Sequence, residues 1–200
     1  MGQKMKKIKR KELVRLNPLL DSMVRGPQVI LPKDFGSILA YTGLGRESRV
    51  VEAGAGSGFL MIMLGNVCKK VYSYERNERF YKLAMKNLER SGLRNVVLKF
   101  KDVTKGIEEK NVDAVILDMA DAVEVIPTAY NALKEGGFIV GYLPNVEQMK
   151  GFYLAAEKHG FVGLFAVETI VREWKVRSFG VRPNTKGLTH TGFLVFGRKS

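Results

Sequence analysis

The chain has 200 residues, of which 46% are hydrophobic and 26% are charged. This composition excludes an intrinsically disordered chain, because the apolar residues are numerous enough to form a core. The apolar runs are far shorter than the ~18 residues of a membrane-spanning helix, and no apolar signal core follows the basic N-terminus, so we expect neither a membrane protein nor a secreted one. The single cysteine, Cys68, cannot form an internal disulfide, which suits a reducing cytoplasm and excludes a cysteine-based zinc site.

The formal net charge is +13, and its excess lies at the two ends of the chain. Residues 1–15 hold seven Lys or Arg and one Glu, and residues 171–200 hold the same numbers, so the middle is nearly neutral. Basic patches commonly bind polyanions, and nucleic acid is the commonest of these. A solvated basic surface without a partner is the alternative, and the charge favours nucleic acid.

The N-terminal part of the chain is expected to contain little regular structure. Residues 1–16 are polar and predict a partly helical arm. Three prolines within residues 17–34 exclude a long helix there, because each removes a backbone donor and restricts the residue before it. A helix is predicted over residues 35–41, with Asp34 as its cap and Gly43 as its end.

Strands and helices then alternate along the chain. The predicted strands span residues 49–53, 71–75, 96–101, 112–117 and 138–143, and the predicted helices span residues 59–68, 78–91, 121–134 and 146–159. Two late strands, 161–170 and 189–197, are separated by a long polar loop and are expected to pair antiparallel at one edge. The pattern predicts one domain, with a mostly parallel sheet that is covered by helices on both faces.

A glycine-rich turn joins the first of these strands to its helix. Residues 54–58 read Gly-Ala-Gly-Ser-Gly, and such glycines let the backbone turn tightly and approach a ligand. The spacing differs from the dinucleotide fingerprint G-x-G-x-x-G, which would need a glycine at Phe59. Because glycines also form plain strand-to-helix turns, the loop alone leaves both interpretations open.

Acidic residues at the neighbouring strand ends favour a ligand site. Glu75 ends the second strand, where a carboxylate can accept both ribose hydroxyls of a nucleoside. Asp102 and Asp118 end the third and fourth strands. Each acid alone is more often a cap or a surface residue, but the carboxyl ends of parallel strands meet at one edge of the sheet. The set therefore predicts a nucleoside cofactor.

This combination resembles a class I S-adenosylmethionine-dependent methyltransferase over residues 26–200. The resemblance narrows to the tRNA (adenine-N1-)-methyltransferase family that acts on position 58. Residues 26–34 are similar to the family's G-x-Q-x-I-x-P-K-D segment, and residues 143–148 are similar to its S-P-C-x-E-Q stretch. Residues 168–177 are similar to E-x(5)-W/Y-x-V-R, and residues 182–199 are similar to the family's R-P…H-T-G-[FY]-L-x-F-x-R-K ending.

The resemblance implies a Rossmann-like α/β fold, with a seven-stranded mostly parallel sheet and an antiparallel C-terminal edge strand. Residues 1–25 would form a basic arm and residues 26–200 the methyltransferase domain. By resemblance Glu75 would hold the ribose of S-adenosyl-L-methionine, and Asp102 with the backbone of Val103 would hold the adenine. The full set of expected cofactor residues is Gln28, Ile30, Glu52, Gly54, Gly56, Ser57, Gly58, Phe59, Leu60, Glu75, Arg76, Asp102, Val103 and Asp118.

Asp118 is also the expected catalytic residue. The donor's methyl group is already activated, so catalysis is mainly in-line positioning, and a carboxylate near the target adenine would stabilise the positive charge that develops on the ring. Trp174 is a candidate stacking surface for a base turned out of its stack, while Tyr142 and Phe179 suit stacking and ordinary packing equally. Arg172, Arg177, Arg182 and Lys186 would contact phosphates, and His190 is expected to be structural rather than a base.

Two departures from the family pattern leave other functions open. The family usually has D-[LI]-P-x-P after the fourth strand, whereas residues 118–122 read Asp-Met-Ala-Asp-Ala. The segment before residue 26 is also too short for the family's small N-terminal β domain, and the basic arm is expected to help hold RNA instead. The alternatives are a methyltransferase for a protein isoaspartyl carboxylate or a small molecule, and a non-catalytic RNA-binding subunit. No metal ion is expected, and the resemblance implies a homo-oligomer, dimer or tetramer.

Overall fold

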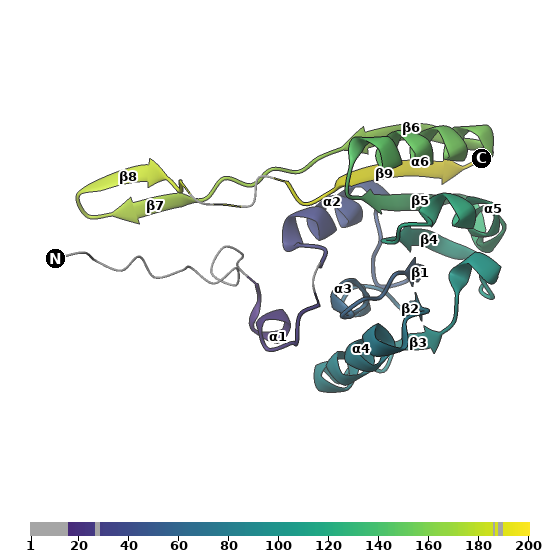
Figure 1. Cartoon of the computed structure of the whole chain (residues 1–200), viewed down its shortest axis with the longest axis horizontal. Coiled ribbons are helices and arrows are strands. Elements are labelled where there is room, and N and C mark those ends of the chain that lie inside the picture. The colour runs from purple at the N-terminus through teal and green to yellow at the C-terminus, as the bar shows by residue number, and fades with distance from the viewer. Residues whose placement is uncertain (1–15, 27–28, 186, 188–189) are drawn as a thin grey trace.

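The computed structural model describes residues 16–26, 29–185, 187 and 190–200. Within these residues, the main sheet has seven strands in the order β3-β2-β1-β4-β5-β9-β6 (Figure 1). The strands are β1 (Arg49–Ala53), β2 (Lys70–Glu75), β3 (Val96–Phe100), β4 (Val112–Leu117), β5 (Leu133–Leu143), β6 (Phe161–Val167) and β9 (Phe193–Lys199). The helices are α1 (Pro18–Asp21), α2 (Pro32–Thr42), α3 (Phe59–Gly65), α4 (Glu78–Ser91), α5 (Ala122–Ala132) and α6 (Val146–Lys158), with a 3-10 turn, η2 (Val103–Lys105).

The strand directions confirm the predicted sheet. The pairs among β1 to β5 are parallel, and β9 runs antiparallel to both β5 and β6. The two late strands therefore pair antiparallel at one edge, as predicted. The C-terminal strand itself lies one position inside that edge, since β6 is outermost.

The parallel strands are apolar on both faces because helices cover both (Figure 1). Val50 belongs to the core cluster under α1, α2, α3 and α4, whereas the next residue, Val51, belongs to the cluster under α5 and α6. The same alternation places Ile116 in the first cluster and Leu117 in the second. Successive side chains of a strand point to opposite faces, so an apolar run without alternation indicates a sheet buried on both sides.

The predicted polar loop between the two late strands contains a β-hairpin. Strands β7 (Trp174–Arg177) and β8 (Gly180–Pro183) pair antiparallel and project away from the main sheet (Figure 1). The hairpin escaped prediction because its residues have neither an apolar run nor a buried face. It carries apolar side chains in solvent, among them Trp174, 57% exposed, and Phe179, 82% exposed.

Most element ends agree with the prediction to within a few residues, and α2 is the informative exception. Asp34 does not cap this helix, which begins at Pro32, where a proline suits the first helical turn. Instead the buried Asp34 carboxylate accepts hydrogen bonds from Lys33 and Thr191. Within the described residues, no helix is both long and apolar enough to cross a membrane.

Candidate functional site

The glycine loop lies at the carboxyl edge of the sheet, where β1 meets β4. A Cβ atom at Gly54 would lie 1.9 Å from the backbone oxygen of Asp118, so a side chain there would require a backbone shift. Gly54, Gly56 and Gly58 have φ values of +89°, +55° and +82°, in the left-handed region that favours glycine. The strand order reverses between β1 and β4, and ligands of open α/β sheets bind at this point.

Glu75 links the end of β2 to this loop. One carboxylate oxygen accepts the backbone N–H of Gly56 at 2.9 Å, and the other accepts that of Asn77 at 2.7 Å. An ionised carboxylate offers about four acceptor positions, so about two remain for a ligand. Glu75 can therefore shape the loop and still accept both hydroxyls of a ribose.

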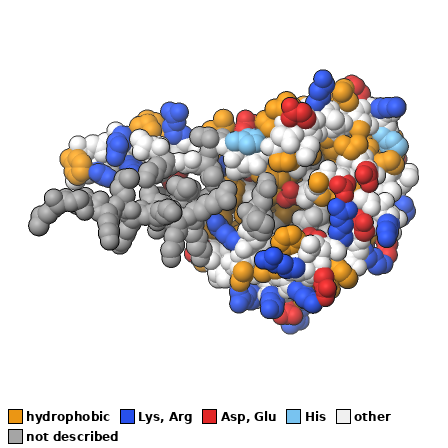
Figure 2. Space-filling model, in the orientation of Figure 1, with side chains coloured by type: hydrophobic (Ala, Val, Ile, Leu, Met, Phe, Trp, Pro, Cys, Tyr) orange, Lys and Arg blue, Asp and Glu red, His pale blue; other side chains and the backbone are white. Residues whose placement is uncertain are grey.

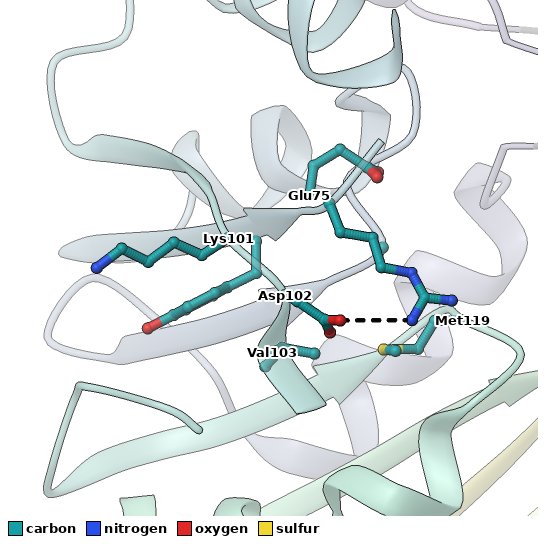
Figure 3. A pocket seen from close by; sticks show the side chains of 8 residues that line it. Glu75, Lys101, Asp102, Val103 and Met119 are labelled. Carbon is teal, nitrogen blue, oxygen red and sulfur yellow. Dashed lines mark ion pairs between the residues drawn. The ribbon is translucent and has the colours of Figure 1, made fainter. Parts of the chain in front are cut away.

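A pocket with about 300 Å³ of empty space, partly open to solvent, lies beside Glu75. Glu75, Asp102 and Val103 line it from the ends of neighbouring strands (Figure 3). Asp102 accepts hydrogen bonds from the backbone N–H and the hydroxyl of Thr104, at 3.0 and 2.8 Å, and these bonds hold its pKa below the usual range. An ionised acceptor at this position suits an exocyclic amino group of a base.

Arg76 also lines this pocket. Its guanidinium lies 2.6 Å from the Asp121 carboxylate and 3.8 Å from that of Asp102, the second pair being the dashed line in Figure 3. Asp121 precedes α5, so the ion pairs join the predicted adenine site to the segment after β4. That segment lacks the family's prolines, and Arg76 provides a charged restraint on it.

Glu52 lies inside the sheet rather than at the pocket surface. It is fully buried, and the hydroxyl of Ser73 donates to its Oε1 at 2.5 Å. Desolvation raises its pKa to about 8, and the carboxylates of Asp118 and Glu75 add to the rise. Glu52 is therefore mostly protonated at neutral pH, and any effect on a ligand passes through the neighbouring residues.

Asp118 ends β4 directly against the glycine loop. Its backbone N–H donates to the carbonyl of Ala53 at 2.9 Å, which fixes its position. Among the described residues, the Asp118 carboxylate has no hydrogen-bond donor, and burial raises its pKa to about 7. A carboxyl group with a strongly raised pKa next to pocket residues such as Gly54 and Met119 is typical of functional sites.

The other predicted cofactor residues fall into two groups. Ile30, Ser57, Phe59 and Leu60 are buried around the glycine loop, so contact with a ligand through the last two would involve their backbone rather than their core side chains. Gln28 lies outside the described residues.

The pocket also contains residues that the sequence reasoning missed or did not assign, namely Tyr74, Lys101 and Met119. They could have been predicted from the sequence, because each is adjacent in the chain to Glu75, Asp102 or Asp118.

Two residues predicted to contact the substrate lie in surroundings that indicate a structural role. Tyr142 is 2% exposed, and its ring lies against Gly192, so the structure favours core packing over a stacking surface. His190 lies 2.6 Å from Glu168 and 3.0 Å from the carbonyl of Pro144, and both contacts raise its pKa. These two bonds use both ring nitrogens, which fits the structural role expected of His190.

The remaining predicted RNA residues lie on the hairpin or beside it, away from the pocket. Arg172, Trp174, Arg177 and Arg182 are all exposed, whereas Lys186 lies outside the described residues. In the space-filling view the hairpin carries both basic and hydrophobic side chains (Figure 2). The structure thus separates the expected contacts into a cofactor pocket and the projecting basic hairpin of β7 and β8.

The doubly covered sheet, the glycine loop at its switch point and the acidic strand ends define a class I methyltransferase. The chain belongs to the family described as tRNA methyltransferase complex GCD14 subunit, whose model matches residues 20–183. The family resemblance inferred from the motifs is thereby confirmed.

Individual relatives agree with this assignment. The chain is 36% identical to the tRNA (adenine(57)-N(1)/adenine(58)-N(1))-methyltransferase TrmI of Methanocaldococcus jannaschii, over 90% of this chain and 74% of that protein. Its fold matches the crystal structure of the tRNA (m1A58) methyltransferase TrmI from Aquifex aeolicus with a TM-score of 0.84 at 33% identity, over 91% of this chain and 74% of the other. A SAM-dependent O-methyltransferase from Thermotoga maritima matches with a TM-score of 0.86 at 30% identity, over 92% and 71% of the two chains.

Proposed function

We propose that this chain transfers the methyl group of S-adenosyl-L-methionine to N1 of an adenine in tRNA, at a position of the 57/58 type. The observation that carries the proposal is Asp118, a partly exposed residue with a raised pKa whose backbone lies against Gly54 of the glycine loop, beside a pocket suited to a nucleoside. The matched family and the activities named for the TrmI relatives support the choice of tRNA and of the adenine N1 atom.

The residues present fit this donor. Glu75 keeps acceptor capacity for the ribose, Asp102 is an ionised acceptor for the adenine amino group, and Ser57 Oγ is a buried hydroxyl with no partner among the described residues. S-adenosyl-L-methionine supplies a methyl group that is already activated on a positively charged sulfur.

Asp118 has two roles in the proposed reaction. Its carboxylate accepts a hydrogen bond from the exocyclic amine of the target adenine, which turns N1 toward the methyl group. As N1 forms its new bond, positive charge moves onto the adenine ring, and the adjacent carboxylate stabilises it. The reaction needs no strong base, in agreement with the structural surroundings of His190.

The direct test is methyl transfer to an unmodified tRNA transcript, with labelled cofactor and analysis of the digested nucleosides. We expect label in 1-methyladenosine, and labelling that is slower by about 10²- to 10³-fold when Asp118 is replaced by alanine. A parallel reaction with an isoaspartyl peptide covers the alternative acceptor, because a protein-L-isoaspartate O-methyltransferase from Petrotoga mobilis is 34% identical over 58% of this chain. Labelled peptide without labelled tRNA would contradict the proposal. No transfer together with tRNA binding would indicate a non-catalytic subunit.

The ion pairs of Arg76 with Asp102 and Asp121 give a separate prediction with a smaller expected effect. Replacing Arg76 with methionine leaves Asp102 and Asp121 unpaired, and we expect about 3- to 10-fold weaker binding of S-adenosyl-L-methionine, since a partly exposed ion pair contributes little. Calorimetry measures the affinity. The control is Lys82→Met, which removes an exposed pair with Glu78 on the outer face of α4 and is expected to change nothing. Equal affinities of the two variants would contradict a role for the bridge.

The hairpin is proposed to hold tRNA phosphates. Lys175 and Arg182 lie directly opposite each other across β7 and β8, an arrangement of like charges that favours an anionic partner. The guanidinium of Arg177 lies 5.7 Å from the centre of the Phe179 ring at the turn. This basic and aromatic surface suits RNA, with Arg172 and Trp174 at its base.

Replacing both Arg177 and Arg182 with alanine is expected to weaken tRNA binding by about 10-fold and to reduce the slope of log affinity against log salt by about 2. The affinity for S-adenosyl-L-methionine should not change. The matched control replaces Lys86 and Arg90, which are exposed on α4 at the opposite edge of the sheet. The same loss in both double variants would indicate a general charge effect and not a hairpin site.

The remaining expectations from the sequence are proposals as well. A basic arm over residues 1–25 would assist a methyltransferase domain over residues 26–200 in holding RNA. A homo-oligomer is supported by the exposed apolar side chains of the hairpin, such as Val176, 76% exposed, because an isolated two-stranded hairpin is marginally stable in water. A cytoplasmic location is supported by the single, buried cysteine.

A further inference from the structure

The segment after α1 is held against the glycine loop by a buried asparagine. Asn87 of α4 accepts the backbone N–H of Val24 at 3.1 Å and donates to the carbonyls of Val24 and Ser57, both at 2.8 Å. Asn87 is fully buried, so these bonds fix the two segments relative to each other. Residues 24–26 therefore form one wall beside the loop.

Two polar side chains at this wall lack partners among the described residues. A Cβ atom at Gly26 would lie 3.5 Å from Ser57 Oγ, and Ser57 is only 2% exposed. The Ser57 hydroxyl has no hydrogen-bond partner, and neither have Nε and Nη2 of Arg25, although all three atoms are shielded from solvent. The Arg25 guanidinium carbon lies 5.9 Å from the centre of the Phe59 ring, at the start of the helix that follows the loop.

The chemistry of Arg25 indicates what kind of ligand would satisfy it. Shielded guanidinium N–H groups without an acceptor are energetically costly, so an anion is the expected partner. Nε and Nη2 are neighbouring donors on one side of the guanidinium, and their parallel N–H groups match the two oxygens of a carboxylate. Ser57 adds a hydroxyl donor on the adjoining wall.

The positions of these groups along the glycine loop indicate which ligand carboxylate they would bind. Glu75 contacts the loop at Gly56, on the side of the pocket for the adenosine end, whereas Arg25 lies beyond Ser57 at Phe59. S-adenosyl-L-methionine carries its α-carboxylate at the end opposite to its adenosine. We infer that Arg25, assisted by Ser57, binds the α-carboxylate of the methyl donor's amino-acid end. This inference rests on the proposed function.

Two ligands that differ at that end test the inference by calorimetry. S-adenosyl-L-homocysteine carries the carboxylate, and 5′-methylthioadenosine lacks the whole amino-acid end. Arg25→Met is expected to bind S-adenosyl-L-homocysteine about 10- to 100-fold more weakly, the range for hydrogen bonds to a charged group, and 5′-methylthioadenosine within about two-fold of the wild type. Ser57→Ala is expected to show a smaller loss with the same selectivity.

The matched control is Arg49→Met. The Arg49 guanidinium also lies 5.9 Å from an aromatic ring, that of Tyr72, but at the start of β1, the end of the strand away from the glycine loop. Both affinities should be unchanged in this variant. Arg25→Lys, which keeps the charge and loses the paired donors, provides a second measurement if Arg25→Met does not fold, and it should lose affinity for S-adenosyl-L-homocysteine alone.

The possible failures are distinguishable. Unchanged binding of S-adenosyl-L-homocysteine by the Arg25 variants would overturn the inference and leave the proposed function intact. Equal weakening of both ligands would also overturn it, because Arg25 would then support the loop and not the carboxylate. If the wild-type chain binds neither ligand, the proposed function fails and the inference fails with it.

Discussion

Replacing Asp118 with alanine is expected to reduce turnover by about 10²- to 10³-fold, the range for removing one group that stabilises transition-state charge. The affinity for S-adenosyl-L-methionine should change little, because Glu75 and Asp102 hold the nucleoside end through other bonds. Single-turnover methylation of tRNA measures the first quantity and calorimetry the second. Full activity in the variant would remove Asp118 from the mechanism.

The same residue predicts the pH dependence of the reaction. Burial raises the pKa of Asp118 to about 7, and the proposed mechanism uses the ionised form. The rate of methyl transfer should therefore rise as pH increases through about 7 and become level above it. Asp118→Asn keeps a hydrogen-bond acceptor without the charge, so its lower rate should not rise in this range. A wild-type rate that falls between pH 6 and 8, on the order of one unit either side of this pKa, would contradict the assignment.

Replacing Gly54 with alanine is expected to have the largest effect on the fold. The added Cβ would lie 1.9 Å from the Asp118 backbone oxygen, and φ at this position is +89°. The loop and the end of β4 would have to separate, so we expect a loss of at least about 3 kcal/mol in the free energy of unfolding, together with loss of cofactor binding. Denaturant unfolding and calorimetry measure the two effects.

Gly56→Ala is the matched control for this variant. Gly56 also has a left-handed φ, +55°, but the nearest atom to an added Cβ would lie 3.8 Å away. Its cost should be about 1 kcal/mol, from the backbone conformation alone. Similar losses in the two variants would show that backbone strain, and not the contact with Asp118, makes Gly54 necessary.

The sequence predicted the sheet and the cofactor crevice because both depend on local patterns. Apolar runs without alternation, such as residues 112–117, identify strands that are covered on both faces. The carboxyl ends of parallel strands meet at one edge, so Glu75, Asp102 and Asp118 could be placed together from their chain positions alone. The register of β1 with β2 and β4 confirms that these ends lie level.

Local sequence patterns of this kind did not predict the contacts between segments that are distant in the chain. The exposed hairpin of β7 and β8 has no buried face to give periodicity, and the carboxylate of Asp34 bonds to Thr191 instead of capping its own helix. The ion pair between Arg76 and Asp121 and the contact of Gly26 with Ser57 likewise join residues far apart in the chain.

The sequence by itself determined the class of this protein, its family and the edge of the sheet at which it acts, because strand-end chemistry and motif spacing are local properties. The sequence also showed that the net charge of +13 comes mostly from the two basic ends of the chain. Only the tertiary structure decided how these parts are arranged. Packing of distant segments places Asp118, whose carboxyl pKa is raised, beside the glycine loop, buries Tyr142, and puts Lys175, Arg177 and Arg182 on a projecting hairpin. Burial and long-range contact set these features, and neither is encoded in any short stretch of residues.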